Sequence, residues 1–443
     1  MHIFFSGIGG TGIGPLAVVA KEAGYDVSGS DLMDSNYIKY LRNYGIHDIE
    51  IGQMRHQIEA LHAKKPIDWL VYSSAVPKTN PDHPELLFCQ EHDIKMTKRD
   101  EFLNEILARK QLRLIAVAGT HGKTTTTAML IWLFKQLREP ISYSVGAKIE
   151  FGQMGAYDPR SECFVYECDE FDRNFLAFNP YLTVISGIAW DHHEIFPTQD
   201  DYNEAFRHFI GQSGKTILWD EDYEKLYEKE SDNQQSDQLI VCSGDDPHIE
   251  QIKLTGLYNR RDAWLAIKAL SELNEHRPGD LITLMNQFPG LSRRFEKITD
   301  NLYSDYAHTP EKITGSMDIA REKAQKTNQK IVVIYEPLTN RRMHYTATAH
   351  RDLFEGASAI YWVPSYLARE DPRMPLLTPK ELIERLNPTL RKIAQSMKLD
   401  SLLQDTIEDH LSKGDLVVAM TGGGAGSLDE WLRKEFADEN NKY

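Results

Sequence analysis

The chain has 443 residues, 41% of them hydrophobic, which is long enough for about three domains that each bury a core. Acidic residues outnumber basic ones by 66 to 50, and the formal charge of −16 argues against a nucleic-acid partner or an anionic membrane surface. The cysteines form no CxxC pair, and no apolar run reaches the roughly 18 residues of a membrane helix. Since a strand directly follows Met1, we expect a cytoplasmic protein without a leader or a membrane-spanning segment.

A glycine turn follows the first predicted strand, at residues 2–6. The run Gly7-Ile8-Gly9-Gly10-Thr11-Gly12 has G-x-G-x-x-G spacing, a helical stretch comes next, and Asp31 lies about 20 positions further on. This pattern places a diphosphate at the N-terminus of the first helix and the acidic residue near a sugar hydroxyl. The alternative is a turn whose glycines serve close packing only. We expect residues 1–108 to form one small α/β domain, in which Ser73 and Ser74 end a later strand at a plausible ligand-binding edge.

A second glycine turn follows a predicted buried strand at 114–118. The run Gly119-Thr120-His121-Gly122-Lys123-Thr124-Thr125 is a shortened phosphate loop, because Val117 stands where the usual first glycine would be. Its glycines let backbone N–H groups turn inward, Lys123 can reach the outer phosphates of a nucleoside triphosphate, and the Thr124 hydroxyl can ligate Mg²⁺. The alternative is a plain turn between strand and helix with a chance Gly-Lys-Thr.

Two further predicted strands end in residues that can bind a metal. Glu167 is the last residue of a strand at 163–167, and His192 follows a strand at 182–186. Because ligands bind beyond the carboxyl ends of parallel strands, both side chains should emerge beside the phosphate loop and could hold a second divalent ion. The alternatives are a helix cap or a surface position. We expect this central domain to span 109–290, and a third α/β domain of doubly wound type to span 291–443.

In this order along the chain, the motifs resemble those of the Mur ligases of bacterial cell-wall synthesis, over essentially the whole length. The motifs that carry the resemblance are Gly7–Gly12, Ser28–Asp31, Tyr72–Ala75, Ala118–Thr127, Glu167–Asp172, Asp191-His192, Gly256 with Asn259, Arg293–Glu296 and Asp305–Pro310. One departure is Asp262, where the family has a second asparagine. The resemblance implies a Rossmann-like N-terminal domain, a central parallel sheet of the phosphate-loop ATPase type, and a Rossmann-like C-terminal domain.

The resemblance also implies an activity: an ATP- and Mg²⁺-dependent carboxylate–amine ligase. In this family, ATP phosphorylates the substrate carboxylate, an amine attacks the acyl phosphate, and an amide, ADP and phosphate result. The substrates implied for the branch that this chain resembles are UDP-N-acetylmuramate and L-alanine. The implied UDP-muramate site consists of Gly9, Gly10, Thr11, Gly12, Asp31, Ser73 and Ser74. The implied ATP site consists of Gly119, Thr120, His121, Gly122, Lys123, Thr124 and Thr125, with Asn259 at the adenine, Asp305 at the ribose and Arg294 at the γ-phosphate.

The remaining implied roles concern the metal, the amino acid and catalysis. Thr124, Glu167 and His192 are the implied metal ligands. Tyr306, His308 and Arg342 would face the amino acid. The implied catalytic residues are Lys123, Glu167, His192, Arg294 and His308.

The acceptor is the least determined part of this prediction. Only Arg342 matches the arginine pair expected for L-alanine, since the other position is Thr339, whereas Glu336-Pro337 and Asn340 are more like an enzyme that recycles a murein tripeptide. Two alternatives outside the ligases are an NAD(P)-dependent oxidoreductase built on the first glycine turn and a nucleotide-gated binding protein. Phosphate release that requires both an amino acid and a UDP-sugar acid would distinguish the ligase from both. We expect no nucleic-acid or membrane partner, and the sequence leaves a monomer or a homodimer open.

Overall fold

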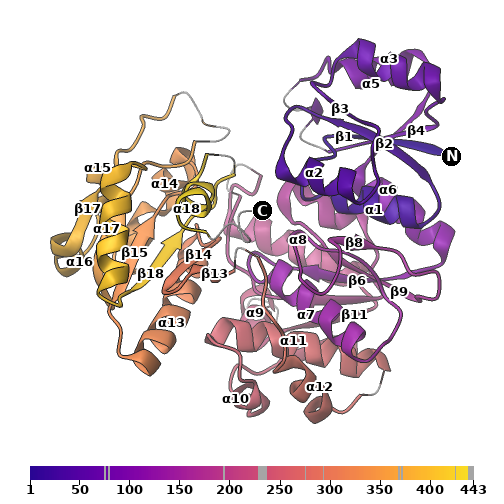
Figure 1. Cartoon of the computed structure of the whole chain (residues 1–443). Coiled ribbons are helices and arrows are strands. Elements are labelled where there is room, and N and C mark those ends of the chain that lie inside the picture. The colour runs from indigo at the N-terminus through magenta and orange to yellow at the C-terminus, as the bar shows by residue number, and fades with distance from the viewer. Residues whose placement is uncertain are drawn as a thin grey trace. The chain divides into compact units, whose positions relative to one another are not determined.

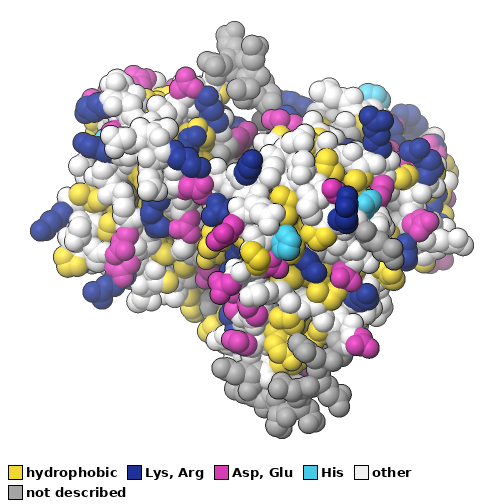
Figure 2. Space-filling model, turned by 90° about the horizontal axis from the view of Figure 1, so that it is seen from below, with side chains coloured by type: hydrophobic (Ala, Val, Ile, Leu, Met, Phe, Trp, Pro, Cys, Tyr) yellow, Lys and Arg dark blue, Asp and Glu magenta, His cyan; other side chains and the backbone are white. Residues whose placement is uncertain are grey.

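Two compact units make up the protein, shown as a computed structural model in Figure 1. The structure describes residues 1–73, 76–77, 80–192, 195–227, 237–274, 276–292, 294–367, 370, 373–424 and 426–437. The first unit is Met1–Lys253 with Arg261–Pro289, and the second is Leu254–Arg260 with Gly290–Tyr443. Over these residues, no helix has both the length and the apolar character needed to cross a membrane. Acidic and basic side chains are interspersed on the face shown in Figure 2.

The N-terminal part of the first unit is a five-stranded parallel sheet with the order β3-β2-β1-β4-β5. Its elements are β1 (His2–Ser6), α1 (Gly14–Glu22), β2 (Asp26–Asp31), α2 (Asn36–Asn43), β3 (Ile49–Ile51), α3 (Arg55–Lys64), β4 (Trp69–Tyr72), α5 (Pro84–Glu91), β5 (Lys95–Lys98) and α6 (Arg99–Lys110). Every residue of β1 is buried, as its apolar composition predicts for a central strand. Because all the strands are parallel, the first glycine turn and the end of β2 lie at one edge of the sheet.

The rest of the first unit is built on a seven-stranded sheet with the order β12-β11-β10-β6-β9-β7-β8. Its strands are β6 (Arg113–Ala118), β7 (Ser142–Ser144), β8 (Gly155–Ala156), β9 (Cys163–Glu167), β10 (Leu182–Ile185), β11 (Lys215–Trp219) and β12 (Leu239–Cys242). Its helices are α7 (Lys123–Gln136), η1 (Phe171–Ala177), α8 (Gln199–Gln212), α9 (Asp220–Tyr227), α10 (His248–Gln251), α11 (Leu257–Asn274) and α12 (Pro278–Met285), except that the start of α11, up to Arg260, belongs to the second unit. All pairings are parallel except that of β7 with β8. Since β6 lies between β10 and β9, the second glycine turn leaves the middle of the sheet.

One hydrophobic core joins these two sheets within the first unit. It contains Phe5, Trp69 and Phe102 from the N-terminal part and Phe175 and Phe206 from the central part. Helix α1 also contacts β7 and β8. All four cysteines are buried and free of disulfides. The predicted domain limits at 108 and 290 stay predictions, and the first of them falls within α6.

The second unit contains a six-stranded sheet with the order β13-β14-β18-β15-β16-β17. Its elements are β13 (Glu296–Thr299), β14 (Leu302–Asp305), α13 (Pro310–Thr327), β15 (Ile331–Tyr335), α14 (Asn340–Thr346), η2 (Ala347–His350), β16 (Ala357–Trp362), α15 (Pro379–Ile383), α16 (Pro388–Ile393), β17 (Ala394–Ser396), α17 (Ser401–Ser412), β18 (Leu416–Met420) and α18 (Leu428–Phe436). Alternate residues of β15 pack into two different hydrophobic cores: Val333 lies in one core, and Val332 lies in the other. A sheet covered on both faces is the doubly wound architecture that the sequence predicts, and only β13 runs antiparallel to its neighbour.

Candidate active site

The phosphate loop has the backbone that its glycines predict. Gly119 and Gly122 have φ of +134° and +78°, in the region that favours glycine. A Cβ added to Gly119 would lie 2.6 Å from Ser186 Oγ, and one added to Gly122 would lie 2.6 Å from Asp262 Oδ1. Helix α7 begins directly after this turn, at Lys123. In the described part of the chain, the backbone N–H groups of Gly122, Lys123 and Thr124 donate to no acceptor, so they can receive an anion at the helix N-terminus.

Thr120 connects the phosphate loop by hydrogen bonds to the segment that follows β10. Its N–H donates to the Gly187 carbonyl at 2.8 Å, and its hydroxyl donates to the Ala189 carbonyl at 2.7 Å. The same oxygen accepts the Ala189 N–H at 2.9 Å and lies 2.7 Å from the Tyr202 hydroxyl. The Ser186 hydroxyl donates to the His121 carbonyl. The hydroxyl of Thr120 therefore has an internal role, and its predicted contact with ATP stays a prediction.

Lys123 is held by two acceptors in this structure. Its Nζ donates to the Gly119 carbonyl at 2.6 Å and to Glu170 Oε2 at 2.5 Å. Burial lowers the pKa of Lys123, but the nearby carboxylates Glu170 and Asp169 outweigh it, so the pKa is raised above its ordinary value. The lysine is therefore a fixed positive charge at the start of α7.

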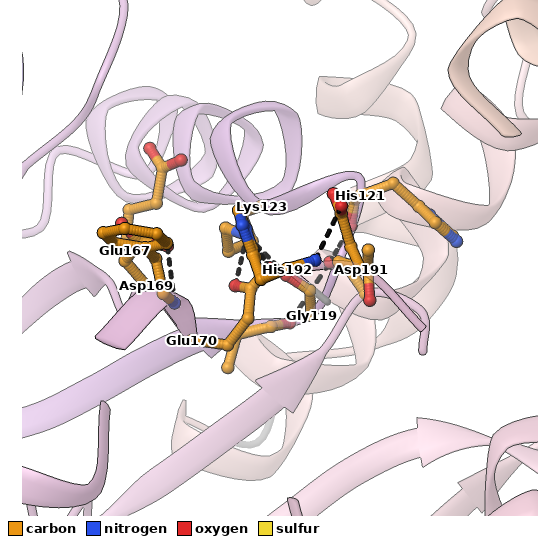
Figure 3. Close-up of polar contacts among 12 residues, drawn as sticks. Gly119, His121, Lys123, Glu167, Asp169, Glu170, Asp191 and His192 are labelled. Atoms are coloured by element: carbon orange, nitrogen blue, oxygen red, sulfur yellow. Dashed lines mark hydrogen bonds and ion pairs between the residues drawn. The ribbon is translucent and has the colours of Figure 1, made fainter. Parts of the chain in front are cut away.

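Glu170 is a site residue that the sequence analysis missed. Its side chain is only 2% exposed and lies between Lys123 and His192, whose Nε2 is 3.7 Å from Oε1 (Figure 3). Burial raises the pKa of this carboxyl, although Lys123 opposes the shift. A signal was available in the acidic run at 167–172, but four carboxylates stand there and nothing in their order indicates which one is buried.

Two of the three predicted metal ligands are hydrogen-bonded to each other, and the third lies beside another carboxylate. Glu167 Oε1 accepts the Thr124 hydroxyl at 2.7 Å, while its other oxygen accepts the Gly146 N–H at 3.1 Å. His192 instead lies beside Glu170, with a backbone φ of 54° that is unusual for a residue other than glycine. The carboxylate and hydroxyl oxygens of Glu167 and Thr124 are a donor set that fits Mg²⁺. No group of three or more His, Cys, Asp or Glu side chains suited to a metal occurs among the described residues, so the roles of all three predicted ligands stay predictions.

The first glycine turn is hydrogen-bonded to Asp31, the acidic residue that was predicted to lie near a sugar hydroxyl. Asp31 Oδ2 accepts the Gly9 N–H at 2.8 Å, so at least one carboxylate oxygen supports the turn itself. The Gly10 N–H donates to the Gly7 carbonyl at 3.0 Å. Ser73 directly follows β4, at the edge that carries the turn, whereas Ser74 lies outside the described residues. The assignment of Asp31 to a sugar hydroxyl stays a prediction.

The second unit contains the residues predicted to bind the nucleotide base, the ribose and the amino acid. Asn259 Nδ2 donates to the Thr255 carbonyl at 2.8 Å. The Arg294 guanidinium lies over the Tyr306 ring at 5.2 Å, and that ring packs edge-on against His308 at 4.7 Å. Asp305 is buried, and burial raises its pKa although Arg294 opposes the shift. Their roles are untested, and Arg293 of the same motif lies outside the described residues.

The features that favoured a tripeptide acceptor have internal partners. Glu336 Oε1 accepts the Leu428 N–H at 3.1 Å, and its Oε2 accepts the Thr421 hydroxyl. The Asn340 amide donates to the Pro375 carbonyl at 3.1 Å and accepts the Leu377 N–H at 2.8 Å. These two side chains therefore connect loops of the second unit, and such a role explains their presence without a peptide ligand.

The glycine-lined loop, the free N–H groups of α7, and the Lys123 and Glu167 side chains define a nucleotide-dependent enzyme of the phosphate-loop class. Two family models match the chain: "Mur ligase family, catalytic domain" over residues 2–111 and "Mur ligase middle domain" over residues 117–268. The chain belongs to the Mur ligase family and is thus an ATP-dependent ligase that forms an amide and ADP. Membership of this family favours the ligase prediction over the oxidoreductase.

Relatives extend the similarity to the whole chain. A UDP-N-acetylmuramate–L-alanine ligase of Nocardioides sp. is 28% identical over 437 residues, which cover 96% of this chain and 94% of that protein. One of Caldicellulosiruptor bescii is 28% identical over 471 residues, with 97% of each covered. Among solved structures, the fold is similar to that of a UDP-N-acetylmuramate–alanine ligase from Thermotoga maritima, with a TM-score of 0.74, 23% identity and 98% of each chain covered.

Proposed function

We propose that the protein joins L-alanine to the carboxylate of UDP-N-acetylmuramate, with hydrolysis of ATP to ADP and phosphate, in the cytoplasm. The observation that carries this proposal is the presence of two glycine turns in one compact unit, one before α1 and the other, the phosphate loop, before α7. A UDP-linked acid and ATP can thus be bound by the same body. The names of the full-length relatives supply the two substrates.

The reaction proceeds in two steps. A carboxylate oxygen of the sugar acid attacks the γ-phosphorus of ATP, the bond to the bridging oxygen breaks, and ADP leaves. The amine nitrogen of L-alanine then attacks the acyl carbon, the carbon–oxygen bond to phosphate breaks, and an amine proton passes to a base, for which we propose His308. Lys123 and the N-terminus of α7 counter the negative charge that would otherwise keep the carboxylate away from the phosphates.

Mg²⁺ would be held by Thr124 and Glu167, and His192 is the further predicted ligand. When bound, the ion shields the negative charge of the phosphates. The protein's own part is to fix the oxygen donors: Gly146 holds one oxygen of Glu167 so that the other points at Thr124. Because a neutral amide is a poorer ligand for this ion, Glu167→Gln should raise the Mg²⁺ concentration needed for half-maximal activity.

L-alanine is favoured as the acceptor over a murein tripeptide. The sequence features that pointed to the tripeptide, Glu336 and Asn340, are used inside the second unit. Arg342, with Arg341 beside it, is the proposed partner of the amino-acid carboxylate, and a charge-assisted bond of this kind contributes roughly 1.5–3 kcal/mol.

The test is a competition assay read by mass spectrometry. The purified protein is incubated with ATP, Mg²⁺, UDP-N-acetylmuramate, and equal concentrations of L-alanine and L-alanyl-γ-D-glutamyl-diaminopimelate. We expect the L-alanine adduct, and phosphate release that requires both the amino acid and the UDP-sugar. Preferential formation of the tripeptide adduct would show that L-alanine is not the acceptor. Phosphate release in the absence of both L-alanine and the tripeptide would show that the ligase proposal is wrong.

A further inference from the structure

A pocket of about 620 Å³ lies in the first unit, where α1 of the N-terminal part packs against β7 and β8 of the central part. It is lined by Glu22, which is the last residue of α1, by the end of α7 and the chain that follows it, and by residues 156–160. Pockets of this size bind small molecules, and they are common where two parts of a protein join. None of the roles proposed above uses a residue of this pocket.

The pocket is distant from both glycine turns. Helix α1 begins at Gly14 after the first turn, and α7 begins at Lys123 after the phosphate loop, whereas the pocket lies at the C-terminal ends of both helices. At 1.5 Å per residue, the 14 residues of α7 place roughly 20 Å between the pocket and the phosphate loop. A molecule in this pocket therefore does not occupy the positions that the two turns provide.

The three carboxylates that line the pocket already accept hydrogen bonds within the first unit. Their partners are Tyr44 and Tyr157 for Glu22, Asn274 and His276 for Glu139, and Arg160 for Asp158. In each carboxylate, both oxygens have a partner. A ligand is therefore not needed to supply these groups with donors.

Two cations of the pocket have donors to spare. An ammonium group has three N–H donors, but among the described residues Lys135 Nζ donates only to the Phe151 carbonyl, at 2.8 Å. Over the same residues, the Arg138 guanidinium makes no hydrogen bond or ion pair. Burial lowers the pKa of Lys135, and the charge of Glu22 opposes that shift without cancelling it. The unmet hydrogen-bonding capacity of the pocket is thus on its cations.

The backbone at Arg138 is of a kind that usually carries glycine. The residue follows Leu137, the C-cap of α7, and its φ of 59° lies in the left-handed region. Glycine adopts this conformation with less strain, so the end of the helix does not by itself require an arginine here. A cation near the C-terminus also favours the helix dipole, but Lys135 in the last turn already serves that purpose.

Gly152 makes room for the Lys135 side chain. A Cβ at this position would overlap the Lys135 ammonium group and the Tyr143 hydroxyl. The ammonium group also lies 5.4 Å from the centre of the Tyr143 ring. Tyr143 and Ile141 are buried and line the pocket, so the cation borders an apolar wall. An anion bound to Lys135 would place the rest of its molecule against that wall.

We propose that this pocket is a separate ligand site, which binds a small molecule through an anionic group on Lys135 and Arg138 and an apolar or aromatic body against Ile141 and Tyr143. An anion supplies the acceptors that the two cations lack, and the wall removes the body of the ligand from water. The site goes beyond the proposed ligase function and does not depend on it. A carboxylate and a phosphate offer the same acceptor chemistry, so the test includes one probe of each kind.

The test is calorimetric titration of the full chain with phenyl phosphate and with phenylacetate. A non-hydrolysable ATP analogue, Mg²⁺, UDP-N-acetylmuramate and L-alanine are present at saturation, so that the substrate positions are filled. We expect binding with a dissociation constant of about 1 mM, as is typical for ligands of this size. Benzyl alcohol lacks the charge and inorganic phosphate lacks the ring, and each should bind at least about 10-fold more weakly.

Four variants locate the bound probe. Lys135→Met and Arg138→Met each remove one cation, and each should weaken the binding of both probes about 10-fold. Gly152→Ala keeps every charge but displaces the ammonium group, and it should weaken binding as well. The matched control is Lys64→Met, which removes an exposed lysine of α3 outside the pocket and should bind the probes as the wild type does.

Each outcome decides the proposal. No binding of either probe up to about 10 mM overturns it, and so does wild-type affinity in folded Lys135→Met and Arg138→Met. Binding that disappears when the substrates are present overturns it too, because the probe would then belong to the substrate positions. Equal affinity for benzyl alcohol overturns the anionic requirement, and equal affinity for inorganic phosphate overturns the apolar one. Thermal unfolding checks each variant, and should Lys135→Met fail to fold, Arg138→Met decides. If the probes bind as expected but the protein makes no amide, the inference stands and the proposed ligase function fails.

Discussion

Lys123 must change partners when a nucleotide binds. Its ammonium group is held by Glu170 and the Gly119 carbonyl, and it has to leave the carboxylate to reach the outer phosphates. Because this charge has no substitute at the start of α7, Lys123→Ala should lower the turnover number about 10²- to 10³-fold. The measurement is the rate of ADP formation with both substrates present.

A second variant distinguishes a loss of catalysis from a loss of stability in Lys123→Ala. Removing the lysine leaves Glu170 buried without its main cation, so the double variant Lys123→Ala with Glu170→Gln should recover stability but not activity. Lys148→Ala, at an exposed position of the same unit, should behave as wild type. Full turnover by the folded Lys123→Ala protein would contradict the assignment.

Glu85 gives the protein a pH-dependent stability. The carboxyl is 1% exposed and accepts the Ser6 hydroxyl at 2.5 Å. Burial raises the pKa of Glu85 from 4.5 to about 7, against the hydrogen bonds from Ser30 and Ser6. Since the folded state binds this proton more tightly than the unfolded state, the stabilisation is complete below pH 4.5 and is lost as the pH rises through about 7.

Urea unfolding at pH 5 to 8 checks this expectation. The contribution of Glu85 should fall by about 3 kcal/mol across that window, as the shift in its pKa requires. In Glu85→Gln, which has no proton to lose, that part of the pH dependence should be absent. Identical pH profiles for the two proteins would show that the pKa of Glu85 is close to its ordinary value.

At the scale of elements, Thr120 connects the phosphate loop with the segment after β10. Thr120→Val keeps the shape of the side chain but removes the partner of Tyr202 and of the Ala189 N–H. Leaving buried polar groups unpaired costs about 1–3 kcal/mol each, so the melting temperature should fall. Thermal unfolding and the KM for ATP are the two measurements.

The comparison variant Tyr202→Phe removes only the tyrosine hydroxyl and leaves the Thr120–Ala189 bonds in place. It should lose less stability than Thr120→Val and keep the wild-type KM. If Thr120→Val raises the KM for ATP without any loss of stability, the hydroxyl serves the nucleotide and its internal role is minor.

The elements that could be predicted from the sequence are those set by local chemistry. Apolar runs predicted the buried strands β1 and β6, and glycines at fixed spacing predicted both turns, because few other residues adopt positive φ. The role of Glu170 could not be predicted in this way. It depends on the short η1 turn, in which Asp172 and Arg173 have φ near +59° and +58°, and the pattern of four acidic residues does not show that geometry.

Long-range contacts account for the other omissions. Arg99 meets Gly12 only because β5 and β1 belong to the same parallel sheet, whose strand order is not written in any local motif. Glu336 and Asn340 resembled acceptor-binding residues, yet their partners, Leu428 at the start of α18 and Pro375, lie far away along the chain. Residue type alone does not show whether a side chain contacts a ligand or forms hydrogen bonds within the protein.

At the scale of the whole molecule, the two units should unfold in separate transitions. The described hydrophobic clusters are confined to one unit or the other: Phe5 and Phe206 share one core of the first unit, and Val333 and Val332 lie in cores of the second. Because both glycine turns belong to the first unit, UDP and Mg²⁺-ADP should raise the transition of that unit. Differential scanning calorimetry with and without each ligand is the measurement, and a single transition that shifts as a whole would contradict it.

Gly12 and Arg99 cannot change independently. A methyl group at position 12 would occupy the space of the guanidinium, so Gly12→Ala alone should displace Arg99, whereas Gly12→Ala with a shorter residue at 99 removes the overlap. Among related chains, a side chain at position 12 should therefore accompany a smaller residue at position 99. Such paired variation would show that the space shared by the two positions, and not either residue alone, constrains both.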